Sequence, residues 1–156
     1  MTTKTKPPPR PVFRALDPDE CAVMMSGHHV GRIAYTFHDR VNIEPIHYVL
    51  DEDWIFGRTA EGAKLLTLCH HPWVAFEVDE VEGPFDWRSV VARGTFCPLR
   101  PIGTPGERAT YARALDAIKR ITPTAFTPDD PVPERNVIFG IAVHELTGRA
   151  ASSSRA

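Results

Sequence analysis

Cysteine is scarce in this chain, and its spacing excludes two common kinds of small stable domain. Cys21, Cys69 and Cys97 are odd in number, widely separated and without a CxxC pair. A disulfide framework needs an even set, and a thiolate zinc site needs closely spaced pairs. We therefore expect a protein of the reducing cytoplasm, without structural zinc.

Long apolar runs and an excess of one charge are missing as well. The apolar runs are only a few residues long, and the N-terminus leads into prolines rather than into an apolar signal core. Eighteen basic and twenty acidic residues are well mixed, which leaves no basic face for nucleic acid. These features predict a soluble, cytoplasmic protein without a membrane or nucleic-acid partner.

Familiar metal and nucleotide motifs are also absent. The histidine pairs at 28–29 and 70–71 are not part of an HExxH motif and have no matching Cys/His partner, so no metal site is expected. Neither a Walker loop nor a GxGxxG motif is present, which argues against a nucleoside triphosphate or a dinucleotide held in the usual fold.

What the chain does contain suits one globular domain. Its 156 residues are 42% hydrophobic, enough for a single core. Prolines and polar residues near the N-terminus predict a flexible arm over residues 1–15. The domain itself is expected over residues 16–149, followed by a flexible tail at residues 150–156.

The order of predicted elements favours an antiparallel barrel over alternating βαβ units. A helix is expected from residue 17 to about 27, followed by a three-strand meander at residues 30–37, 41–50 and 54–56. Then come a helix at 60–68, strands at 73–79 and 87–97, a helix at 106–121, a loop with four prolines at 122–133, and a strand at 136–146 that ends in a turn at 147–149. This is a mainly β, α+β arrangement with six strands and helices at the barrel ends.

The junction between the strand at 54–56 and the following helix suits a phosphate group. Thr59 is placed to cap the helix, which leaves backbone N–H groups and the positive end of the helix dipole free. Arg58 adds a planar donor fork, and Lys64 lies about one and a half turns into the helix, with a side chain that leans back toward its start. The alternative is that both charges are solvated and Thr59 is only a cap.

Five segments, in order and at similar spacing, resemble the pyridoxamine 5′-phosphate oxidase-like family of FMN-binding split β-barrel proteins over about residues 16–149. They are residues 30–34 (Val-Gly-Arg-Ile-Ala), 42–48 (Asn-Ile-Glu-Pro-Ile-His-Tyr), 56–65 (Phe-Gly-Arg-Thr through Gly-Ala-Lys-Leu), 74–79 (Val-Ala-Phe-Glu-Val-Asp) and 89–94 (Ser-Val-Val-Ala-Arg-Gly). The resemblance implies a six-stranded antiparallel split β-barrel and a homodimer with FMN in the crevice between two barrels.

The resemblance also implies a set of cofactor-binding residues. Arg58, Thr59 and Lys64 would hold the phosphate, and the strand through Glu44, Pro45, Ile46, His47 and Tyr48 would run beside the isoalloxazine ring. Trp87, Arg88 and Ser89 fall near the flavin in related proteins, and Arg149 falls where relatives often present a basic residue to the partner's cofactor. Alternatives remain open: Pro45 as an edge-strand blocker, Trp87 at the dimer seam and Arg149 as a surface charge.

The implied activity is that of an FMN-dependent oxidoreductase that passes electrons to a small organic acceptor, with catalytic residues unassigned. His47 and Tyr48 are the candidate proton donors, although packed or solvent-facing roles are favoured. Gly57 replaces the histidine of nitroimidazole reductases, and the short C-terminus lacks the signature of true pyridoxamine phosphate oxidases. One alternative is the deazaflavin F420, with Arg32, Arg88 and Arg93 supplying charge. The other is a non-enzymatic flavin or haem protein for sensing or storage.

Overall fold

Antiparallel pairing organises residues 10–153, the part of the chain described by this computed structural model. The strands are β1 (Pro11–Leu16), β2 (Val30–Phe37), β3 (Arg40–His47), β4 (Val49–Asp51), β5 (Trp54–Thr59), β6 (Trp73–Gly83), β7 (Asp86–Pro98) and β8 (Val137–Ser153). They form one sheet in the order β3-β2-β6-β7-β8-β5-β4, with β1 paired to β8. The predicted mainly β split barrel is confirmed, but the described residues form eight strands rather than six.

The barrel is split at Tyr48. One strand was expected over residues 41–50, yet β3 and β4 lie at opposite ends of the sheet order, so the expected three-strand meander is wrong. Tyr48 is fully buried between them, and its hydroxyl donates a hydrogen bond of 2.6 Å to the Met25 carbonyl. Because β3 and β4 are separated by this single residue, the sheet must curl until its two ends meet there.

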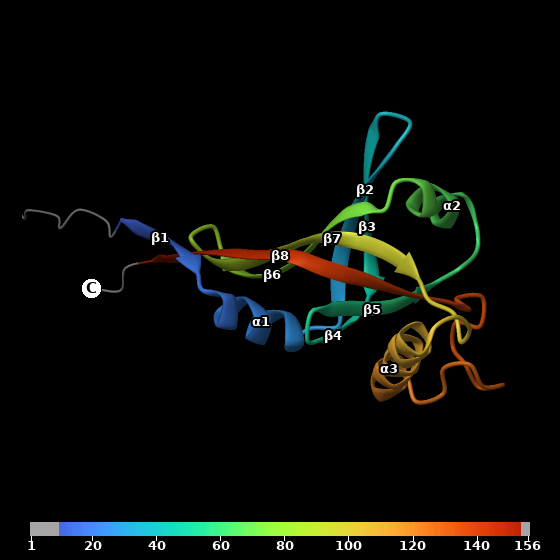
Figure 1. The fold of residues 1–156 in the computed structure, drawn as a ribbon. Coiled ribbons are helices and arrows are strands. Elements are labelled where there is room, and N and C mark those ends of the chain that lie inside the picture. The colour runs from blue at the N-terminus through green and yellow to red at the C-terminus, as the bar shows by residue number, and fades with distance from the viewer. Residues whose placement is uncertain (1–9, 154–156) are drawn as a thin grey trace, which may run out of the picture.

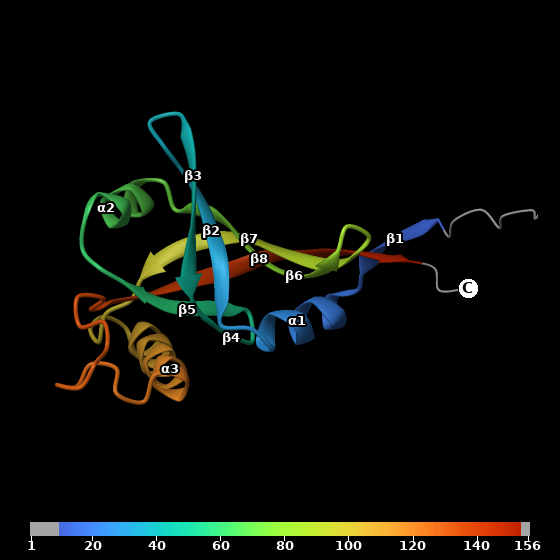
Figure 2. The same ribbon diagram turned by 180° about the vertical axis from the view of Figure 1, so that it is seen from behind.

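Three helices accompany the sheet: α1 (Pro18–Ser26), α2 (Ala63–His70) and α3 (Pro105–Ile121). Asp17 with Glu20, and Thr104 with Glu107, form reciprocal capping boxes that fix the starts of α1 and α3 close to where the sequence predicted them. Figure 1 shows α1 along one side of the sheet and α3 across one end, an arrangement that Figure 2 confirms from behind. None of these three helices has the length and apolarity needed to cross a membrane.

The two ends of the described chain pair with each other. β1 runs antiparallel to the last part of β8, so residues 11–15 of the expected arm and residues 150–153 of the expected tail are strand. Residues 1–9 and 154–156 lie outside the described range. The predicted turn at residues 147–149 is wrong as well: a Cβ at Gly148 would lie 2.7 Å from the Cys21 sulfur, so this glycine permits close packing of α1 against a continuous strand.

Two groups of buried side chains form the core. The larger fills the inside of the curled sheet and includes Ile33, Tyr48, Phe76, Phe139 and Ile141. The smaller lies between α3 and the β4–β5 hairpin and includes Phe56, Ala114, Ala117, Ile118 and Ile138. Helix α3 therefore closes one end of the barrel.

Candidate functional site

The junction between β5 and α2 differs from its sequence-based prediction. Thr59 does not cap the helix, because it continues β5, where it pairs with Val137 and is buried. Helix α2 begins four residues later, at Ala63, with Gly62 at its N-cap and no side-chain cap hydrogen bond. Lys64 therefore lies in the first turn of α2 rather than further along. The first-turn N–H groups are left uncapped, in contrast to those of α1 and α3.

The predicted convergence of Arg58 with Lys64 is absent. Arg58 is only 8% exposed, and its two terminal nitrogens lie 2.5 and 2.9 Å from the Asp130 carboxylate oxygens. The guanidinium also lies 5.1 Å from the centre of the Phe126 ring. Because this side chain is buried and fully engaged, it secures the proline-rich loop after α3 to β5.

Asp130, which no sequence motif indicates, organises that loop. Its carboxylate accepts backbone N–H bonds of 2.8 Å from Phe126 and 3.0 Å from Val132, besides the pair with Arg58. The Arg58 hydrogen bond and these backbone donors hold the pKa of Asp130 well below its usual range. The partners lie 72 residues apart in the sequence, and no local motif signals their contact.

Lys64 and Glu44, two of the predicted site residues, do come together. The Lys64 ammonium forms an ion pair with the Glu44 carboxylate, which joins the first turn of α2 to strand β3. The predicted phosphate-binding junction therefore lies beside the strand predicted to run along the flavin ring. Lys64 remains partly exposed, so its ammonium can still reach an anion bound at the start of the helix.

Strand β3 is a terminal strand of the sheet. Of the strands described, only β2 pairs with it, so its outer backbone groups are not engaged by another strand. Ile46 points into the core, whereas Pro45 and His47 are exposed. His47 Nδ1 lies 3.5 Å from a terminal nitrogen of Arg135, a second residue that sequence reasoning missed.

The remaining predicted residues lie near the β6–β7 hairpin, far along the sheet from α2 (Figure 1). The Ser89 hydroxyl donates a 3.0 Å hydrogen bond to Glu77, whose other oxygen pairs with Arg32. Arg149 is exposed directly opposite Ser89 in the β7–β8 register. Within one chain these residues therefore lie away from the Lys64–Glu44 pair.

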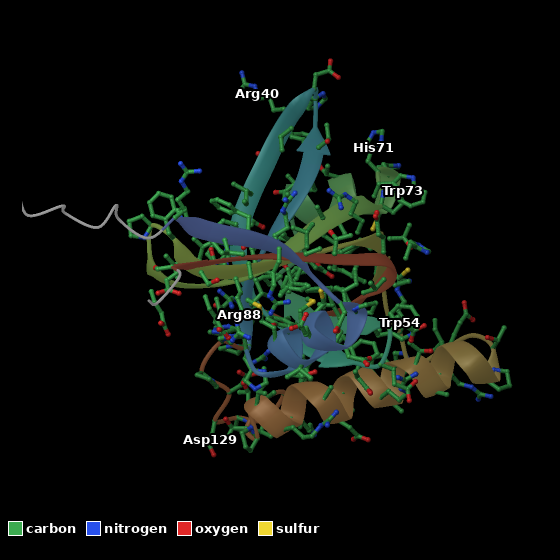
Figure 3. All side chains as sticks on the ribbon, turned by 90° about the vertical axis from the view of Figure 1, so that its left-hand side faces the viewer. Arg40, Trp54, His71, Trp73, Arg88 and Asp129 are labelled. Carbon is green, nitrogen blue, oxygen red and sulfur yellow. The ribbon has the colours of Figure 1, made fainter. Side chains whose placement is uncertain are left out.

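Trp87 and Arg88 precede Ser89 on β7. The Trp87 ring is half-buried, 6.4 Å from the ring of Phe13 on β1. Arg88 is exposed and pairs at 2.5 Å with Glu80, which also contacts His28. Figure 3 shows Arg88 on a different side of the sheet from Trp73.

The three arginines considered for F420 do not converge. The strand register places Arg32 and Arg93 on one face of the sheet and Arg88 on the other. Each also has a carboxylate partner: Glu77 and Asp79 for Arg32, Glu80 for Arg88, and Glu145 for Arg93 at 3.8 Å. This distribution gives no concentrated positive charge for a longer acidic cofactor tail.

One face of the sheet exposes a group of large apolar side chains. By the strand register, Val30, Val41, Ile43, Trp73 and Val81 share the face that carries Arg32 and Ser89. Ile43 is 67% exposed and Trp73 is 71% exposed. Figure 3 shows Trp73 projecting near His71 at the α2 end of this face. Apolar groups in such numbers on one face are typical of an interaction surface.

Gly57 lies inside the barrel, where it has no room for a side chain. A Cβ at this position would lie 2.6 Å from the Phe139 ring and 2.9 Å from the His47 carbonyl oxygen. A histidine here would require both neighbours to shift, so the departure from nitroimidazole reductases noted in the sequence has a packing counterpart.

With this geometry in place, comparison with known proteins identifies the family. A family profile described as pyridoxamine 5′-phosphate oxidase matches residues 17–150. The chain belongs to this family. An uncharacterized protein of Rhizobium meliloti is 25% identical over 146 residues, which cover 88% of this chain and 95% of that protein.

Solved structures of related size share the pyridoxamine 5′-phosphate oxidase fold. A Corynebacterium glutamicum protein proposed to be a pyridoxamine 5′-phosphate oxidase is 26% identical, with a TM-score of 0.66 over 91% of this chain and 99% of that one. A FAD-binding protein of Mesorhizobium loti superposes with a TM-score of 0.71 at 22% identity, covering 91% and 99% of the two chains. A FAD-binding protein of Mycobacterium smegmatis gives 0.63 at 24% identity, covering 87% and 98%. These structures share the fold of this chain.

Proposed function

We propose that this protein is an FMN-dependent oxidoreductase that binds the flavin phosphate at the start of α2. The observation that carries the proposal is the uncapped first turn of α2 with Lys64 beside it. Uncapped N–H groups and the helix dipole favour an anion, and Lys64 adds a full positive charge. Helices α1 and α3 do not offer this arrangement, because each has a capping box and an acidic first turn.

The donor set at this position fits a phosphate with two changes from the sequence-based prediction. Lys64 and the α2 amides are the proposed ligands, whereas Arg58 acts on the loop that carries Asp130. Thr59 forms the buried end of β5 and supports the turn into α2. Its ion pair with Glu44 keeps Lys64 on the side of α2 that faces β3. The proposed phosphate position therefore lies next to the strand proposed to hold the ring.

The isoalloxazine is proposed to lie along β3. A flat, polar-edged ring needs backbone donors and acceptors, and the outer side of a terminal strand offers them. Glu44, Pro45, Ile46 and His47 would contribute mainly through their backbone, since Ile46 points inward and Glu44 is paired with Lys64. Pro45 has no backbone N–H, so β3 has one donor fewer for the flavin or for pairing with β2. A strand at the edge of a sheet tolerates this loss.

A homodimer with the flavin between two barrels explains why the predicted residues form two groups. Trp87, Arg88, Ser89 and Arg149 lie too far along the sheet to act with Lys64 of the same chain, but a second copy could bring them to the first copy's flavin. The apolar face that contains Ile43 and Trp73 provides a surface for such an association.

The flavin would supply hydride and electron transfer, so a protein nucleophile is not needed. The chain would hold the ring, present hydrogen-bond donors to its edge and leave one face open to a small acceptor. FMN is preferred to F420 because Arg32, Arg88 and Arg93 are paired and face different sides of the sheet. Pyridoxamine phosphate is not the proposed substrate.

Two measurements test this function. The mass and absorbance of the ligand released from purified protein should be those of FMN; release of FAD, F420 or haem would contradict the cofactor assignment. In anaerobic stopped-flow mixing, reduced FMN on the protein should be reoxidised by an added quinone or nitroaromatic, and pyridoxamine phosphate should not reduce the flavin. A flavin inert to every donor and acceptor would favour sensing or storage.

A further inference from the structure

A cavity of about 230 Å³ lies between the end of β3, strand β5, the end of α3 and the loop after α3. Its walls include the apolar side chains of Tyr48, Phe56, Ile118, Ile121 and Val132. The loop that closes it folds back beside the C-terminal end of α3, near Asp129 in Figure 3. The cavity is smaller than the 300–1,000 Å³ of pockets for drug-sized ligands, so it suits a compact molecule with about one ring.

Arg135 gives this apolar cavity a positive charge. Among the described residues no carboxylate lies within 4.0 Å of its guanidinium, and its polar neighbour is His47 Nδ1 at 3.5 Å. The other arginine of the wall, Arg58, is already neutralised by Asp130. One guanidinium without a carboxylate partner at a mainly apolar cavity favours a ligand with one anionic group.

The loop that carries Arg135 is held in place before any ligand binds. The buried Arg58–Asp130 pair fixes its middle, and the Arg135 N–H bonds to the Val132 carbonyl at 3.0 Å. The Arg135 carbonyl also faces the Arg58 guanidinium, at 3.5 Å. An anchored loop reduces the ordering cost of binding, so a small ligand can be held by few contacts.

We propose that this cavity binds a small aromatic monocarboxylate, with its ring against Ile121 and Val132 and its carboxylate on Arg135. A small aromatic ring matches the apolar walls, and a carboxylate matches the planar fork of arginine. This proposal does not depend on flavin binding, because all the residues that line the cavity belong to one chain. It lies next to His47 of β3.

Calorimetric titration of the purified protein with benzoate tests the site. Wild type should bind, and Arg135→Gln should weaken benzoate at least tenfold, because the variant loses the charged fork. Arg120→Gln removes an exposed arginine from the same end of α3 and should leave the affinity unchanged. Benzyl alcohol, which keeps the ring and lacks the charge, should bind wild type and Arg135→Gln alike.

Ile121→Phe provides a second variant that keeps Arg135 and fills the cavity, and it should abolish benzoate binding. Wild type that does not bind benzoate, or equal affinity in wild type and Arg135→Gln, would overturn the inference. FMN affinity measured on the same variants separates the two proposals: Arg135→Gln should bind FMN as wild type does. A protein that binds FMN but not benzoate contradicts only the cavity assignment, and the reverse result contradicts only the flavin assignment.

Discussion

At the scale of single residues, the Arg58–Asp130 pair shows how one buried contact can hold a long loop. The loop contains four prolines, and its own backbone hydrogen bonds are local turn bonds, so its attachment to β5 depends on the carboxylate of Asp130. Removing one member of a buried ion pair leaves the other charged and unpaired, which destabilises more than the pair itself contributes.

Asp130→Asn should therefore lower the thermal midpoint by about 10 °C, because Arg58 would lose its charged partner. Asp129→Asn, at the exposed neighbouring position, is the control and should change it by no more than about 1 °C. Thermal unfolding followed by circular dichroism measures both. Equal midpoints for the two variants would show that the pair does not hold the loop.

The same pair predicts a pH dependence of stability. The pKa of Asp130 is lower in the folded protein than in the unfolded chain, where it is about 3.8. The stability from Asp130 is fully present above that value and is lost as the pH falls toward the folded pKa. In urea unfolding at pH 6 and pH 3, wild type should lose more stability than Asp130→Asn does. The same loss in both would contradict the role given to this carboxylate.

Lys64 is the residue with which the phosphate assignment can be tested. Lys64→Ala should weaken FMN by roughly one to two powers of ten, the loss expected for one charge-assisted contact of about 1.5–3 kcal/mol. Riboflavin, which lacks the phosphate, should be affected much less. Lys119→Ala, on the exposed side of α3, is the matched control. Fluorescence titration of both flavins decides, and an equal loss for the two would indicate a general structural role for Lys64.

At the scale of elements, local signals predicted the helices well where capping residues are present. Asp17 with Glu20 and the helical pattern from residue 106 placed α1 and α3 within one residue of their starts. The start of α2 was predicted wrongly, because Thr59 is a residue type that often caps helices and yet does not cap this one. It is kept in β5 by pairing with Val137, 78 positions away. Long-range pairing also extends β8 through Gly148, which looked like a turn residue in isolation.

The residues of the candidate site also divide into those with a local sequence signal and those without one. Lys64 and Glu44 were identified from local motifs and resemblance, and the structure brings them together. Asp130 and Arg135 lie in a loop without regular pattern, so only the folded chain reveals that they approach Arg58 and His47. Contacts between distant, irregular segments carry no local signal in one sequence.

Tyr48 joins the elements on which the split barrel depends. Its hydroxyl bonds the last turn of α1, and its ring contacts Phe76 at 4.8 Å between centroids. Tyr48→Phe keeps the ring and leaves the Met25 carbonyl with less hydrogen bonding, so unfolding free energy should fall by about 1–2 kcal/mol. Tyr35→Phe, at a less buried position on β2, should have a smaller effect. Urea unfolding compares the two, and an equal loss would contradict the role assigned to Tyr48.

At the scale of the whole molecule, the open face of the sheet predicts self-association. Light scattering should give twice the chain mass, and Ile43→Lys should shift the protein toward the monomer because it places a charge in the apolar face. Val23→Lys is the control, since Val23 is 73% exposed on α1, outside this face. A wild-type monomer that binds flavin tightly would contradict a flavin site shared between two chains.

Binding of FMN through its phosphate can be measured by calorimetric titration of the wild-type protein, freed of any ligand, with FMN and with riboflavin. We expect one FMN per chain and an affinity for riboflavin that is weaker by at least tenfold, because riboflavin leaves the start of α2 without its anion. Absence of FMN binding, or equal affinity for the two flavins, would contradict it.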